Sequence, residues 1–119
     1  MKKIAFVFTR APHGNSIGKE GQDALIATSE LTKKISIFFI SDGIYQILDN
    51  QKPNDILLRD YITTFKIFKL YKIQNIYLCT DSLQERGFFK NSKWIIKPRF
   101  INSKQIKNEI SYCKIIITF

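Results

Sequence analysis

Histidine and cysteine are scarce in this 119-residue sequence, which contains one histidine and two cysteines. Two cysteines do not form a disulfide framework, and a single histidine leaves no spacing typical of a metal site. No apolar stretch approaches the roughly 20 residues that a membrane-spanning helix needs. We therefore expect a protein of the reducing cytoplasm that holds no metal and has no membrane partner.

Motifs of nucleotide-binding and hydrolytic enzymes are also missing. The glycine-bearing stretch from Arg10 to Gly18 fits neither a Walker A nor a GxGxxG pattern, so we expect no nucleotide cofactor. No serine-centred elbow and no evident carboxylate pair accompanies the lone histidine, His13. We interpret His13 as a solvated loop residue, and a general base for a neighbouring thiol is the alternative.

Hydrophobic periodicity predicts alternating strands and helices. Apolar runs typical of buried parallel strands occupy residues 3–9, 35–40, 76–79, 94–96 and 114–118. The first of these runs is too short for the apolar core of a signal peptide. Spacings of three and four predict helices over residues 19–31, 54–71 and 103–112, with a short helix between Asp81 and Gly87. The chain is therefore predicted to be one α/β domain, residues 1–119, with a mostly parallel sheet of about five strands and helices on both faces.

Several local features are predicted with these elements. Asp81 should cap the short helix with Gln84 as its capping-box partner, and Gly87 should end it. Asp42 and Gly43 should form a turn after the second strand. The helix over residues 19–31 should face the core with Ala24, Leu25, Thr28 and Leu31.

Ligands of open parallel sheets gather at the carboxyl ends of the strands, and Cys79 is the candidate for chemistry there. It closes the third strand and precedes a helix N-terminus, where free N–H groups would favour a thiolate or a persulfide. The carboxylate of Asp81 would compete for the same groups. The alternative is that Cys79 is a small buried apolar residue, as Cys113 is expected to be.

Aromatic residues are numerous for a small sheet domain. A helix face explains some of them as core, and an exposed excess would indicate a subunit interface. The residues concerned are Phe38, Phe39, Tyr45, Tyr61, Phe65, Phe68 and Tyr71.

The net charge of +9 is concentrated in the second half of the chain. Residues 1–60 carry 8 basic and 7 acidic side chains, whereas residues 61–119 carry 11 and 3. A basic half suggests nucleic-acid binding. The excess of 15 lysines over 4 arginines, with 21 isoleucines and one valine, instead suggests drift in an A+T-rich genome.

Six segments of the chain, which together run nearly end to end, are similar to those of a known protein family. They are IAFVFTRAPHG, GQDALIATS, IFFISDGIYQIL, QKPNDILLRDYITTFKIFKLY, NIYLCTDSLQERG and the C-terminal strand. The most specific of them are APHG and the FF-I-DG-Y-Q pattern. Together these segments resemble the DsrE/DsrF-like family of small sulfur-relay subunits.

The resemblance implies a flavodoxin-like α/β domain that works as a non-autonomous subunit of a sulfurtransferase complex. That complex would be a heterohexamer, a dimer of heterotrimers built from this chain and two homologous sister subunits. It would pass persulfide sulfur to a separate carrier protein, and the sulfur would reach the 2-thio group of a modified wobble uridine in tRNA. This chain would contact tRNA only indirectly.

The resemblance also bears on individual residues. In the family, the persulfide-bearing cysteine of one sister subunit follows the third strand and precedes a helix resembling SLQERG. Cys79 stands at the matching position, which makes it the candidate persulfide site of this chain. Because the catalytic role belongs to the sister, the resemblance implies a mainly structural and docking role here, with basic residues such as Arg10 steering the carrier.

Two alternatives are distinguishable by simple observations. A direct tRNA-binding module would show tRNA affinity with a steep salt dependence. A sulfur-trafficking subunit of oxidative sulfur metabolism would have a sulfite reductase-type enzyme among its genomic neighbours.

Overall fold

The computed structural model describes residues 3–11, 17–48, 75–90, 92, 94 and 96–119. Its elements are β1 (Ile4–Phe8), α1 (Ile17–Ser29), β2 (Ile35–Phe39), the 3-10 helix η1 (Ser41–Gln46), β3 (Asn75–Cys79), α3 (Thr80–Glu85), β4 (Arg99–Ile101), α4 (Ser103–Ser111) and β5 (Ile115–Thr118). None of the helices in these ranges is long and apolar enough to cross a membrane. The helix predicted over residues 54–71 lies outside the described residues, as does His13.

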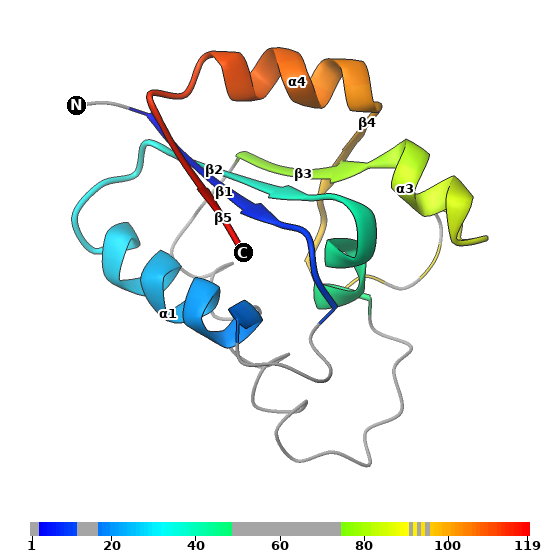
Figure 1. Cartoon of the computed structure of the whole chain (residues 1–119), viewed down its shortest axis with the longest axis horizontal. Coiled ribbons are helices and arrows are strands. Elements are labelled where there is room, and N and C mark those ends of the chain that lie inside the picture. The colour runs from blue at the N-terminus through cyan, green and yellow to red at the C-terminus, as the bar shows by residue number, and fades with distance from the viewer. Residues whose placement is uncertain (1–2, 12–16, 49–74, 91, 93, 95) are drawn as a thin grey trace.

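The five strands form one sheet in the order β4-β3-β2-β1-β5, and all four pairings are parallel. Because the strands are parallel, their carboxyl ends meet at one end of the sheet, which is called the carboxyl edge here. It is distinct from the two side edges, which are formed by the outer strands β4 and β5. Helix α1 covers one face of the sheet and α4 covers the other, as Figure 1 shows. The predicted α/β fold with helices on both faces is confirmed.

The alternation of side chains along the strands divides the core into two layers. Phe6 and Phe8 of β1 point toward the α1 side and pack with Leu25 of that helix. Ala5 and Val7 point to the opposite side, where they belong to the cluster that includes Ile106 of α4. The continuously apolar pattern of β1 therefore follows from burial on both faces.

The second strand decides between core and interface for two of the aromatic residues. Phe38 and Phe39 are fully buried on opposite faces of β2, so they form core and no exposed surface. Tyr45 is partly buried, and its ring meets Phe88 edge-on with centroids 5.7 Å apart. The other four aromatic residues named above lie outside the described part of the chain.

Two predictions are wrong. The fourth strand is not at residues 94–96, because Trp94 makes only an isolated bridge to Leu48 and the strand that pairs with β3 is β4. Leu31 does not face the core and is 78% exposed. Helix α1 ends at Ser29, and the backbone N–H of Leu31 donates to the carbonyl of Thr28, which turns the chain away before Leu31 can pack.

The carboxyl edge of the sheet is closely packed at the start of η1. The backbone of Gly43 lies directly against the backbone carbonyl of Phe8, so a Cβ atom at residue 43 would overlap that carbonyl. The N–H of Ile40 also donates to the same carbonyl at 3.1 Å. Glycine at this position therefore lets η1 pack onto the end of β1, and the predicted turn at Asp42 and Gly43 is confirmed as the first turn of η1.

We expect Gly43→Ala to lower the free energy of unfolding by about 3 kcal/mol, because backbone atoms must move to admit the methyl group. Urea unfolding followed by circular dichroism measures the change. Gly87→Ala is the control, since Gly87 has φ of +74° and no atom within 4 Å of the added Cβ. It should cost about 1–2 kcal/mol. A smaller loss at residue 43 than at residue 87 would contradict the packing described here.

Candidate functional site

Three segments meet at the carboxyl edge, after the adjacent strands β1, β2 and β3. Arg10 follows β1 and is exposed, η1 follows β2, and Cys79 ends β3. The backbone carbonyl of Arg10 accepts a hydrogen bond from the buried Gln46 side chain at 2.8 Å, which ties the end of β1 to η1. The rest of the first loop, residues 12–16, lies outside the described residues.

Cys79 occupies the predicted position between β3 and a helix. It is the N-cap residue of α3, with extended backbone angles and no side-chain capping bond. Its Sγ lies 3.5 Å from Oγ of Ser103, within hydrogen-bond reach for sulfur. The residue is only 3% exposed and belongs to the core cluster that contains Tyr77 and Ile106. Cys79 therefore lies at the predicted position but is almost fully enclosed.

Asp81 is not the N-cap of α3, so the predicted capping box with Gln84 is wrong. Its carboxylate instead accepts the backbone N–H of Ser103 at 3.0 Å. Hydrogen bonds from Ser103 lower the pKa of Asp81 below its ordinary value. With Cys79 as the N-cap, Asp81 lies within the first turn of α3 and reaches sideways to the start of α4.

The capping box of this edge is at α4, where the sequence analysis did not place one. The Asn102 side chain accepts the N–H of Gln105 at 2.8 Å, and the Gln105 side chain accepts the N–H of Asn102 at 2.9 Å. This reciprocal pair fixes where α4 begins. It thereby holds Ser103 over the sulfur of Cys79. The sequence signal that could have predicted this capping box is an asparagine followed three residues later by a glutamine.

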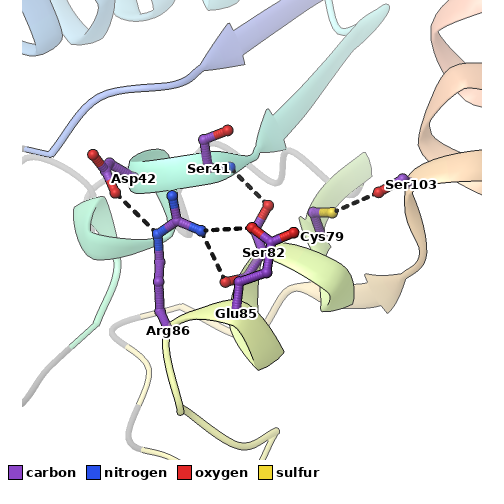
Figure 2. Close-up of polar contacts among 7 residues, drawn as sticks. All are labelled: Ser41, Asp42, Cys79, Ser82, Glu85, Arg86 and Ser103. Carbon is purple, nitrogen blue, oxygen red and sulfur yellow. Dashed lines mark hydrogen bonds and ion pairs between the residues drawn. The ribbon is translucent and has the colours of Figure 1, made fainter.

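A polar network joins η1 to α3 beside Cys79 (Figure 2). Ser41 has a positive φ of 50°, and its backbone N–H donates to Oγ of Ser82 at 2.8 Å. The Arg86 guanidinium donates to Asp42 Oδ1 at 2.9 Å and to the carbonyl of Ser82 at 3.1 Å. It also reaches Glu85 at 3.4 Å. The network connects the ends of β2 and β3, and sequence reasoning missed it because the two halves are about forty residues apart.

Cys113 packs in the same core cluster as Cys79, which confirms its predicted role in packing. Its Sγ donates to the carbonyl of Glu109 at 3.7 Å. Burial raises the pKa of this thiol; the charge of Lys3 acts in the opposite direction and that of Glu109 adds to the rise. Both cysteines of the chain are therefore buried and unpaired thiols.

The arrangement favours a structural use of the two thiols over catalysis within the isolated chain. A thiol must meet its reaction partner to exchange sulfur, and Cys79 is covered by Ser103 and the start of α4. Within the described ranges, no three histidine, cysteine, aspartate or glutamate side chains gather as a metal site would require. Chemistry at Cys79 would need α4 or α3 to move.

Comparison with known proteins finds relatives that match this chain over its full length. The model of the DsrE/DsrF-like family matches residues 2–119. Protein TusC of Escherichia coli O127:H6 is 44% identical over 119 residues, and both chains are covered completely. Protein TusC of Buchnera aphidicola subsp. Baizongia pistaciae is 45% identical with the same complete coverage.

A solved structure agrees with the fold. The crystal structure of the ychN protein from E. coli superposes with a TM-score of 0.83 at 21% identity, and each chain is covered completely. At that identity, the likeness concerns the fold alone. The family model and the two curated relatives go further, and they show that this chain belongs to the DsrE/DsrF-like family.

Proposed function

We propose that this chain is a subunit of a sulfur-relay complex that supplies sulfur for 2-thiolation of the modified wobble uridine of tRNA. The observation that carries this proposal is the 44–45% identity, over all 119 residues, to two proteins named TusC. The match of residues 2–119 to the DsrE/DsrF-like family agrees with it.

In this proposal the chain assembles with a TusB-like and a TusD-like sister subunit. The assembly is a heterohexamer, a dimer of heterotrimers in the cytoplasm. It hands its sulfur to a TusE-like carrier. The carrier, and not this chain, brings the sulfur toward the tRNA-modifying enzyme, so the chain contacts tRNA only indirectly.

The transfer chemistry needs no cofactor. The thiolate of the accepting cysteine attacks the outer sulfur of a persulfide, and a new sulfur–sulfur bond forms. The bond between the two donor sulfurs breaks, and its electron pair leaves with the inner sulfur as a thiolate. The acceptor becomes the persulfide and the donor becomes a thiol after protonation, so no external oxidant or reductant is consumed.

The role of this subunit in that chemistry follows from its two enclosed thiols. Cys79 and Cys113 are both buried, so neither is exposed to a carrier in this conformation. The chain therefore contributes mainly architecture and docking surface, and the working cysteine belongs to a sister subunit. Arg10 is exposed at the carboxyl edge, where its charge can attract an acidic carrier.

Enclosure of the thiols predicts slow chemical modification. In the native chain, Cys79 and Cys113 should each react with Ellman's reagent at least about tenfold more slowly than in urea, which corresponds to about 1.4 kcal/mol of protection. Absorbance of the released thiolate gives both rates. Rapid reaction of one thiol in the native chain would show that a cysteine is accessible and would weaken the docking role.

Cys79→Ser should leave the 2-thiouridine content of tRNA unchanged in cells whose only copy of the gene carries the substitution. Mass spectrometry of tRNA nucleosides measures the content. Cys113→Ser is the matched control, since it makes the same exchange at the other buried thiol. Deletion of the gene should abolish the modified nucleoside, and normal thiolation in the deletion strain would refute the proposed function. Loss of thiolation in Cys79→Ser cells, with the complex still assembled, would instead assign Cys79 a chemical role.

A further inference from the structure

The two edges of the sheet are protected very differently. Edge strand β4 is three residues long, follows Pro98 and begins with Arg99. Arg99 is exposed, and its guanidinium lies 5.9 Å from the centre of the Tyr77 ring of β3, so this edge strand carries a charge. Shortness, proline and charge are the means by which proteins keep an edge strand from pairing with another chain.

Edge strand β5 has none of these protections. Its sequence is IIIT, without charge or proline. Ile115, Ile116 and Ile117 are 43%, 52% and 36% exposed. A strand of this composition at an open edge is a site for pairing with another chain, and it is an aggregation hazard when left uncovered.

The exposed isoleucines lie on both faces of β5. In the register with β1, Ile116 pairs with Ala5 and therefore faces the α4 side, whereas Ile117 pairs with Phe6 and faces the α1 side. A single helix from a partner could cover only one of these faces. A partner that continues the sheet and brings its own helices to both sides would cover both, and an α/β subunit of this same fold has that architecture.

The backbone of β5 also has N–H and C=O groups that point outward, where another strand could pair with them. The N–H of Ile115 donates to the carbonyl of Lys3, just before β1, at 3.4 Å, and the N–H of Phe119 donates to the carbonyl of Val7 in β1 at 2.8 Å. Since alternate residues of a strand direct their backbone groups to opposite sides, those of Ile116 and Thr118 point away from β1. The sheet order ends at β5, and none of the described strands pairs with its outer side.

We propose that the outer edge of β5 joins this chain to a sister subunit, whose own edge strand pairs with Ile116 and Thr118 and extends the sheet across the interface. This proposal rests on the proposed function and adds the surface that assembly uses. The occupant is a sister subunit and not a second copy of this chain, because two copies would bring net charges of +9 together. A sister of lower or opposite charge avoids that repulsion.

Amide hydrogen exchange tests the proposed pairing of β5 with the sister subunit residue by residue. Two samples are compared, the isolated chain and the complex formed by co-expression with the two sister subunits. Exchange is recorded by NMR, and the complex is quenched and dissociated before the measurement. The amides of Ile116 and Thr118 should exchange quickly in the isolated chain and at least about a hundredfold more slowly in the complex. The inward-facing amides of Ile117 and Phe119 should be protected in both samples.

The outcomes separate this proposal from the proposed function. A stable complex in which the amides of Ile116 and Thr118 still exchange freely would overturn the proposed pairing of β5 with the sister subunit and leave the proposed function intact. Failure of the chain to assemble with the sisters at all would refute the proposed function and this inference with it. Protection of both amides in a homodimer of the isolated chain would overturn the choice of occupant.

A pair of substitutions at one position gives an independent test. Ile116→Pro removes an N–H that β1 does not use, so the isolated chain should keep its fold, while the affinity for the sisters should fall at least about tenfold. Ile116→Val keeps the N–H and the branched side chain and should assemble normally. If the proline variant does not fold, Ile116→Lys replaces it, with Asn108→Lys on the exposed surface of α4 as its charge control. Undiminished assembly of whichever variant folds would contradict the proposal.

Discussion

The parallel pairing of β1 with a strand on each side is the constraint on which the rest of the structure depends. It brings the carboxyl ends of β1, β2 and β3 to one edge, where η1 rests on the end of β1 through Gly43. It also forces the chain to return from β4 across the opposite face through α4 to reach β5 (Figure 1). The start of α4 thereby comes to lie over Cys79, and β5 becomes the outermost strand.

These two consequences assign different roles to different parts of the molecule. At the carboxyl edge, Ser103 and the apolar cluster enclose the Cys79 sulfur, which suits a residue that packs more than one that exchanges sulfur. At the β5 edge, isoleucines and backbone groups are left uncovered. The thiol that a catalyst would expose is thus enclosed, whereas the edge strand that a free-standing protein would cover is exposed. That combination fits a subunit whose work is to hold partners in place.

The parts of the fold that sequence could predict are those set by local periodicity. Strands β1, β2, β3 and β5 and helices α1 and α4 were predicted to within about two residues at each end, because each has a continuous apolar or helical pattern. Strand β4 was missed because it has three residues after a proline, and its pairing with β3 depends on contacts distant in sequence. The strand position of Cys79 was predictable, but its enclosure was not, since Ser103 comes from a helix beyond the next strand.

Native mass spectrometry of the tagged chain, purified from the cells that produce it, tests the central claim most directly. The account predicts a stoichiometric complex with two homologous small α/β proteins, present in two copies each. A chain that is recovered alone as a monomer, from cells in which its tRNA is fully thiolated, would contradict it.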